Sequence, residues 1–234
     1  DIANKEISVI GMSFGGAILI KSIAQGMFKN KKAKSIMLYG SPYDSKTFVN
    51  FLVTGEININ ERIKKVKQHE WGVIVTLYNF IDKINIDANK SLIKEILKNK
   101  ILDNEQMIKT LSKQLTHHEK EIVDDALNGK ASTRIKALCN QILNDCEEIM
   151  ESISTKNYCK DIKTKTFIVH GANDTMVPYT ESFLTSKHMD NNNLFISYLY
   201  EHKEISTNSG MLFKAKEFLK MIHYFSKFFY FNAN

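Results

Sequence analysis

Apolar residues along the chain form two kinds of pattern, and each kind predicts a different secondary structure. Short runs that are apolar almost throughout predict buried strands at residues 6–10, 34–39, 165–170 and 194–200. Between the second and third runs, apolar residues recur at intervals of three and four, which predicts amphipathic helices over residues 44–160. Buried strands combined with helices favour an α/β fold with a parallel sheet.

The long helical stretch is interpreted as an insertion into this α/β unit. We predict that residues 1–43 and 161–234 form the α/β core and that residues 44–160 form a helical cap or lid. An insertion of this kind leaves the strands before and after it free to pair in one sheet.

Local signals within the insertion predict where its helices begin and end. Asp103 is a predicted helix N-cap, because Gln106 follows three residues later as in a capping box. Gly129 is placed to end the helix that precedes it. Regular apolar spacing over residues 132–153 predicts one further helix.

The first predicted strand is followed directly by a serine between glycines. Gly11, Ser13 and Gly15 form the pattern G-x-S-x-G at the junction between this strand and a helix of small residues. A nucleophilic serine projects from such a sharp turn, and we expect both glycines to be needed because a side chain there would collide with neighbouring backbone. The N–H of Phe14 starts the helix and is placed to bind a developing oxyanion. A glycine-rich turn of any parallel α/β protein is the alternative interpretation.

An acidic residue and a histidine follow the last two predicted strands. Asp174 ends the sequence Gly-Ala-Asn-Asp after strand 165–170, and His202 lies in Glu-His-Lys after strand 194–200. Open parallel sheets carry their sites at the carboxyl ends of strands. We therefore expect Ser13, Asp174 and His202 to meet at one edge of the sheet.

This order of serine, acid and histidine resembles that of the serine hydrolases of the α/β-hydrolase fold. The resemblance covers residues 5–44 and 162–230, and it implies that Ser13 is the nucleophile, Asp174 the acid and His202 the general base. It further implies cleavage of a carboxylic ester or thioester through an acyl-enzyme. An apolar inner face of the cap would imply a substrate with an apolar acyl group.

Two other functions remain open at this point. One is a catalytically weak or inactive member of the fold whose pocket binds a small ligand or a partner. The other is a different reaction on the same triad, such as hydrolysis of a carbon–carbon bond.

Other residues compete for the roles of acid and base. Asp44 also follows a strand, but the turn that carries Asp174 is favoured as the acid site. His188 and His223 lie in predicted helices and are interpreted as solvated or packed, and His170 lies inside a strand and is interpreted as structural. A solvent-exposed loop histidine is the alternative for His202.

Charge and cysteine content exclude several classes of function. The chain has 32 basic and 26 acidic residues, a net charge of +6, without the clustered basic residues and stacking aromatics of a nucleic-acid site. The three cysteines lack C-x-x-C spacing, and Cys139 and Cys146 share a helical face, so buried thiols are favoured over a disulfide or a metal site. No cofactor motif is found. A small-molecule ester is the expected partner.

The sequence has no apolar run long enough for a membrane span and no visible signal peptide, so a cytoplasmic location is expected. Only a short segment precedes Ser13, whereas the resemblance implies earlier strands and a second oxyanion donor. The strand at residues 6–10 would then have an unpaired apolar edge. We therefore expect this chain to be the C-terminal portion of a longer hydrolase, or to have a separate N-terminal fragment as its partner.

Overall fold

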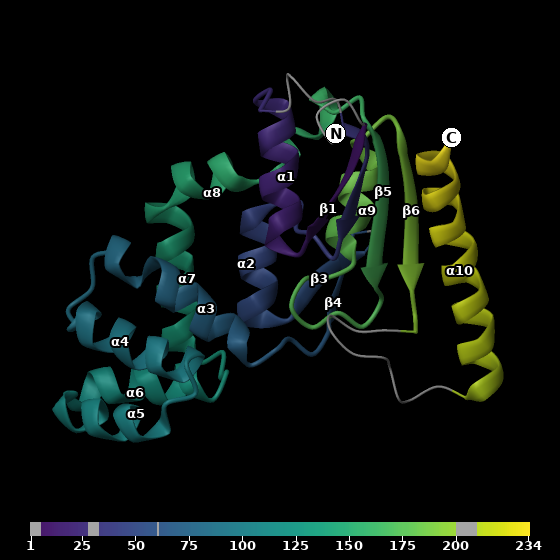
Figure 1. Cartoon of the computed structure of the whole chain (residues 1–234). Coiled ribbons are helices and arrows are strands. Elements are labelled where there is room, and N and C mark those ends of the chain that lie inside the picture. Colours follow the sequence, from purple (N-terminus) through teal and green to yellow (C-terminus); the bar gives the residue numbers. More distant parts are fainter. Residues whose placement is uncertain (1–5, 28–32, 60, 200–209) are drawn as a thin grey trace. The chain divides into compact units, whose positions relative to one another are not determined.

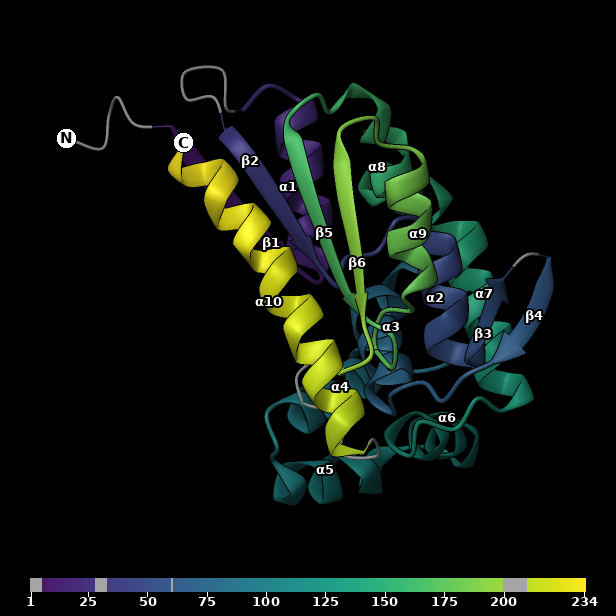
Figure 2. The ribbon, with the colours of Figure 1, turned by 90° about the vertical axis from the view of Figure 1, so that its right-hand side faces the viewer.

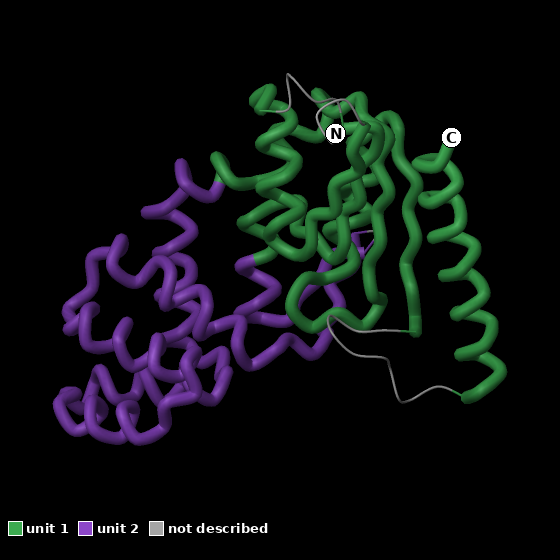
Figure 3. Tube along the Cα trace, viewed as in Figure 1, with its two compact units in different colours: residues 1–48, 151–234 green, residues 49–150 purple. Residues whose placement is uncertain are grey.

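The chain is described by a computed structural model, which covers residues 6–27, 33–59, 61–199 and 210–234. It divides into two compact units (Figure 3). Unit 1 comprises residues 1–48 and 151–234, and unit 2 comprises residues 49–150.

Unit 1 contains a four-stranded parallel sheet, as the apolar runs predict (Figure 1). Its strands, in spatial order, are β1 (Ile7–Met12), β2 (Ala33–Tyr39), β5 (Lys165–Gly171) and β6 (Asn192–Ser197). The register places Met12 opposite Tyr39 and Tyr39 opposite Val169, so the carboxyl ends of these strands are aligned. The predicted α/β class with a parallel sheet is confirmed.

Helices cover both faces of this sheet, because successive strand residues point to opposite sides. Helix α1 (Phe14–Ala24) packs Leu19 and Ile20 against Ile36, Leu38 and Ile168. Helix α9 (Thr180–Lys187) lies on the same face, where its Ser182 contacts His170 of β5.

The opposite face of the sheet is covered by the C-terminal helix α10 (Met211–Ala233), which crosses it in the foreground of Figure 2. Tyr224 and Phe228 of α10 pack against Met37, Phe167 and Val169. The Tyr224 hydroxyl also donates to the carbonyl oxygens of Ile168 and Asn193, at 3.0 and 2.8 Å.

Strand β1 lies at one end of the strand order and pairs only with β2 in the described part of the chain. Its side chains Ile10 and Met12 are 55% and 61% exposed. The apolar edge that the sequence predicts is therefore present.

Unit 2 is mainly helical. Its helices pack buried aliphatic residues such as Ile74, Ile93, Ile122 and Ile135 against one another. They are α3 (Trp71–Phe80), α4 (Lys90–Ile101), α5 (Glu105–Leu111), α6 (His117–Leu127) and α7 (Thr133–Asp145). Two further helices, α2 (Ser45–Thr54) and α8 (Glu147–Ile153), each begin in one unit and end in the other.

An antiparallel hairpin interrupts this helical unit, so the prediction that residues 44–160 are helical throughout is wrong for this segment. Strands β3 (Glu56–Ile59) and β4 (Arg62–Lys65) pair across a turn in which Glu61 has a positive φ of 64°. The alternation Glu-Ile-Asn-Ile in β3 has the two-residue period of a strand, and Ile57 is the buried residue of that alternation.

Two of the predicted helix boundaries differ from the structure. Asp103 has a φ of 55° and does not cap α5, because the side chain of Asn104 accepts the Met107 N–H instead, at 3.2 Å. The single helix predicted over residues 132–153 breaks at Cys146 into α7 and α8. Gly129 follows the end of α6 with a φ of 58°, as its position predicts.

A capping box that the sequence analysis missed starts α6. Glu119 is buried, and its carboxylate accepts the N–H of Thr116 at 2.8 Å and the N–H of Asn89 at 2.6 Å. The Thr116 hydroxyl accepts the Glu119 N–H in return, at 3.3 Å. The hydrogen bond from Asn89, followed by those from Thr116, holds the pKa of Glu119 below its usual value.

We therefore expect unit 2 to lose stability in acid through Glu119. A carboxyl whose pKa is lowered by folding stabilises the protein above its unfolded-state pKa of about 4.5, and that contribution is lost as pH falls through the folded value. Glu119→Gln should lower the free energy of unfolding at pH 7 by about 1–2 kcal/mol. It should also flatten the pH dependence below about pH 5. Urea titrations at several pH values measure both, and an unchanged pH slope would contradict the prediction.

Candidate functional site

Ser13 joins β1 to α1 in a backbone conformation that residues other than glycine seldom adopt. Its φ is 49° and its ψ is −130°, at the N-cap position of α1. Two hydrogen bonds hold this turn, from the Ser13 N–H to the Tyr39 carbonyl at 2.7 Å and from the Gly16 N–H to the Ser13 carbonyl at 3.0 Å. Such conformations cost about 1–3 kcal/mol and concentrate at functional sites. The strained strand-to-helix turn predicted from G-x-S-x-G is therefore present.

Of the two glycine roles predicted for this turn, the structure supports one and contradicts the other. A Cβ on Gly11 would lie 2.6 Å from the Gly16 Cα, so the prediction for Gly11 is confirmed. A Cβ on Gly15 would meet no described atom within 4 Å, so the prediction that Gly15 avoids a collision is wrong. Gly16 is the second tight position, because a Cβ there would overlap the side chain of Ser41. The only signal for Gly16 in the sequence is that the motif ends in two glycines.

This difference predicts opposite outcomes for two neighbouring substitutions. Gly16→Ala should destabilise the protein by about 1–3 kcal/mol, because it overpacks the contact with Ser41. Gly15→Ala is the matched control and should be neutral or slightly stabilising, because alanine favours the helix over glycine. Adding Ser41→Gly to Gly16→Ala should restore stability by removing the obstructing side chain. Thermal unfolding of the three variants measures this, and equal midpoints for the two single variants would contradict it.

The start of α1 provides a donor beside the serine. Phe14 is the first residue of the helix, so its N–H has no carbonyl one turn earlier within the helix to bond. The helix dipole adds partial positive charge at the same end. A developing negative charge next to Ser13 would therefore be stabilised here.

Asp174 lies in the turn after β5 with its carboxylate buried. Its Oδ1 accepts the backbone N–H groups of Met176 and Val177, at 2.8 and 2.9 Å. Its Oδ2 lies 3.5 Å from Nε2 of His170. These backbone donors fix the orientation of the carboxylate, as the acid of a triad requires.

His170 is fully buried, and both of its ring nitrogens are engaged. Nε2 lies 2.8 Å from the Val177 carbonyl, and Nδ1 lies 2.6 Å from the Ser182 hydroxyl. Because a carbonyl only accepts, Nε2 carries a hydrogen and donates it to Val177. This arrangement agrees with the interpretation of His170 as a structural residue.

The alternative acid, Asp44, forms an ion pair and hydrogen bonds with residues outside the predicted triad. Its Oδ2 pairs with Lys156 Nζ at 3.0 Å, and its Oδ1 accepts the Lys46 N–H at 3.0 Å at the start of α2. Its own N–H donates to Glu181 at 2.9 Å. These contacts favour Asp174 over Asp44 as the acid of the site.

Glu181 is a buried carboxylate that the sequence analysis missed. It accepts the N–H groups of Tyr43 and Asp44, both at 2.9 Å, and the hydroxyl of Thr47 at 2.9 Å. Burial raises its pKa, against the effect of these hydrogen bonds. It holds the loop after β2 in place. In the sequence it is indistinguishable from an ordinary acidic residue in the first turn of a helix.

The sheet brings Ser13 and Asp174 to the same edge. Ser13 follows β1 and Asp174 follows β5, with β2 between these strands. Neighbouring strands lie about 4.8 Å apart, so two strand spacings come to about 10 Å. A separation of that size suits a serine and a carboxylate that are bridged by an imidazole. The predicted base, His202, lies outside the described residues, and β6, the last strand before it, is the neighbour of β5.

The other two candidate histidines are placed as their interpretation predicts. His188 ends α9, and its ring stacks on Tyr43 with centroids 5.3 Å apart. His223 lies on α10 and is exposed.

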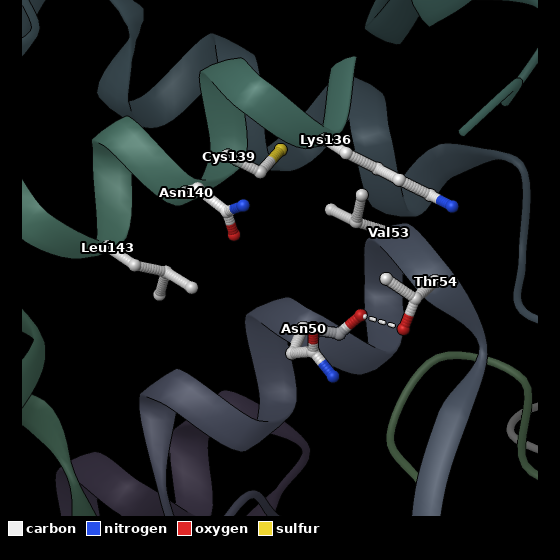
Figure 4. A pocket seen from close by; sticks show the side chains of 7 residues that line it. All are labelled: Asn50, Val53, Thr54, Lys136, Cys139, Asn140 and Leu143. Atoms are coloured by element: carbon white, nitrogen blue, oxygen red, sulfur yellow. Dashed lines mark hydrogen bonds between the residues drawn. The ribbon is translucent and has the colours of Figure 1, made fainter. Parts of the chain in front are cut away.

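A pocket within unit 2 lies between α2 and α7 (Figure 4). The residues that line it are Asn50, Val53, Thr54, Lys136, Cys139, Asn140 and Leu143. Burial raises the pKa of Cys139 to about 12, so its thiol stays protonated and is no nucleophile at neutral pH. Cys146 and Cys159 are also buried free thiols, as predicted for the three cysteines.

No protein-family model matches the sequence, and no match is found among curated proteins. The chain is similar to solved structures of α/β hydrolases. One is an α/β hydrolase enzyme, MGS-M2, from a Medee basin deep-sea metagenome library, with 14% identity, a TM-score of 0.39, and coverage of 96% of this chain and 66% of that chain. A second is a meta-cleavage product hydrolase from Pseudomonas fluorescens IP01, with 12% identity, a TM-score of 0.39, and coverage of 95% and 65%.

A third is an esterase from Exiguobacterium antarcticum, with 12% identity, a TM-score of 0.41, and coverage of 95% of this chain and 67% of that chain. The chain thus spans about two thirds of the length of these structures. At this level of similarity, no activity or substrate is transferred from them to this chain.

Proposed function

We propose that the chain carries the catalytic residues of a serine hydrolase that cleaves a carboxylic ester or thioester. Ser13 is the nucleophile, His202 the general base and Asp174 the acid that orients the histidine. The backbone N–H of Phe14 provides one oxyanion donor. Residues 44–160, which are mainly helical, form the cap, and the substrate carries an apolar acyl group.

The observation that carries this proposal is the conformation of Ser13. A residue with a side chain is held at a φ of 49° and a ψ of −130° between a strand and a helix N-terminus. A glycine would relieve this strain, so the presence of serine there is best explained by a need for its hydroxyl.

The proposed reaction follows from the properties of these groups. The serine hydroxyl is a poor nucleophile at neutral pH, so His202 takes its proton as the oxygen attacks the acyl carbon. The imidazolium that forms is stabilised by Asp174 and returns the proton to the leaving group. Water then attacks the acyl-enzyme, with His202 again acting as base. The Phe14 N–H stabilises the oxyanion in both halves of the reaction.

Covalent labelling with a fluorophosphonate probe tests the nucleophile. Labelling should occur in the wild-type protein and in Ser22→Ala, a matched change in the last turn of α1, and should disappear in Ser13→Ala. Absence of labelling in the folded wild-type protein would refute the proposal and favour a non-catalytic binding protein. p-Nitrophenyl esters of increasing chain length test the acyl group, and kcat/KM should rise as the chain lengthens.

The proposed base predicts a pH dependence of the reaction. Only neutral imidazole accepts a proton, so kcat/KM should rise with pH as the proposed base loses its proton, and an unperturbed histidine side chain does so near about pH 6.5. A rate that stays constant between about pH 5 and pH 8 would contradict the assignment of a histidine base.

A further inference from the structure

Helix α10 carries a second apolar face that packs against no other described part of unit 1. The side chains on this face are large and exposed, and they repeat at helical intervals along the whole helix. They are Met211, Leu212, Phe218, Leu219, Ile222, Phe229 and Tyr230. Leu212 at 89% exposed and Tyr230 at 75% exposed mark the two ends of this face. The outward side of a surface helix is normally polar, so this pattern requires an explanation.

Packing on the sheet does not explain these residues. The face of α10 that contacts the sheet is formed by Glu217, Tyr224 and Phe228, all of them buried. At 100° per residue, Ile222 and Leu219 lie on the opposite side of the helix from these three. Figure 2 shows the helix in the foreground, with its outward side directed away from the sheet.

Basic residues border the outward apolar face. Lys216, Lys220, His223 and Lys227 follow one another along one flank, at the spacing that places them in a row. Lys216 and Lys227 are exposed and form no ion pair with any residue in the described part of the chain. The only acidic residue of α10 is Glu217, which is buried on the opposite side and bonds to Lys220 and to the Tyr198 N–H. The outward face is therefore apolar and basic, with no acidic side chain.

A helix with an exposed apolar face and a flanking row of lysines suits a lipid surface that carries negative charge. Phe, Leu and Ile side chains enter the boundary between headgroups and acyl chains, while lysines contact anionic headgroups. A second copy of the chain fits less well, because its own outward face offers no carboxylate to these lysines. Because one side of α10 packs on the sheet, its 23 residues, about 34 Å in length, would lie along the surface with the other side toward the lipid. Among the described residues, none of the helices has the length and hydropathy of a membrane span.

We propose that the outward face of α10 binds anionic lipid surfaces. The contact is formed by the apolar face defined above, with Lys216 and Lys227 beside it. This proposal is independent of the proposed hydrolysis, because the outward face of α10 contains none of the proposed catalytic residues.

Sedimentation with vesicles tests the proposal. Vesicles of phosphatidylcholine with about 30% phosphatidylserine should bind the protein, and vesicles of phosphatidylcholine alone should bind it much more weakly. Lys216→Gln combined with Lys227→Gln should weaken the binding by roughly 30-fold, from a contribution of about fivefold per lysine near the surface. Leu219→Gln combined with Ile222→Gln should abolish it. Raising the salt concentration should weaken binding to the anionic vesicles.

A matched control removes the same charge elsewhere. Lys109 and Lys113 are exposed residues of unit 2, and Lys109→Gln with Lys113→Gln should leave the binding unchanged. All variants change exposed residues, so circular dichroism and thermal unfolding should show the wild-type fold. Equal binding to neutral vesicles, or equal loss in the control, would overturn the proposal. So would a dimer in light scattering that depends on Leu219 and Ile222 and shows no vesicle binding.

Discussion

Replacing Ser13 with alanine should lower the rate of ester hydrolysis by at least about 1,000-fold, because the variant lacks the atom that attacks the acyl carbon. The substitution keeps the Cβ, so the backbone strain at a φ of 49° and the two hydrogen bonds of the turn remain. Thermal stability should therefore be nearly unchanged. Steady-state kinetics on a p-nitrophenyl ester, together with thermal unfolding of the same preparation, measure both effects.

The outcome separates a catalytic from a structural role for this serine. Ser22→Ala, in the same helix, should retain wild-type kinetics. A Ser13→Ala variant that loses activity only because it fails to fold would show that Ser13 is structural. A folded variant with full activity would remove Ser13 from the mechanism.

Asp174→Asn should lower kcat by roughly 10,000-fold while the protein stays folded. The asparagine keeps one oxygen that can accept the N–H groups of Met176 and Val177, so the turn after β5 is retained. It lacks the negative charge that stabilises an imidazolium and fixes the tautomer of the base. Single-turnover kinetics and a pH profile of kcat/KM measure this loss, and the proposed base should no longer titrate near its original pH.

The rival carboxylate Asp44 provides the matched control for this experiment. Asp44→Asn breaks the ion pair with Lys156 and weakens the start of α2, so it should cost stability and leave kcat close to wild type. If Asp44→Asn abolishes turnover and Asp174→Asn does not, Asp44 and not Asp174 is the catalytic acid. Equal and small effects of both substitutions would refute a triad that includes either.

Single local patterns in the sequence predict much of this fold. Four apolar runs predict the strands of the sheet, because parallel strands are covered on both faces and are apolar at most positions. The run of β1 is the exception in burial, since its Ile10 and Met12 are exposed. The pattern around Ser13 predicts a strained turn, because the glycine at position 11 permits the close approach of backbone that this turn requires. Asp174 is likewise recognised by its place just after a strand.

Local sequence patterns do not predict contacts between segments that are distant in the sequence. Gly16 is needed because of Ser41, and Glu181 is buried because the loop of Tyr43 and Asp44 folds onto it. The residues that contact Gly16 and Glu181 become neighbours only when the strands pair, so the sequence does not identify them. The same holds for the helix boundary at Asn104, where two adjacent residues compete for one capping position.

Local sequence patterns identify the class of fold, the order of the strands along the chain and the candidate nucleophile and acid, because each depends on neighbouring residues in one element. The alignment of the carboxyl ends of the strands, the position of β1 at an edge and the outward side of α10 follow from contacts between distant segments. Both sides of that helix are apolar in sequence, and packing on the sheet buries only one of them.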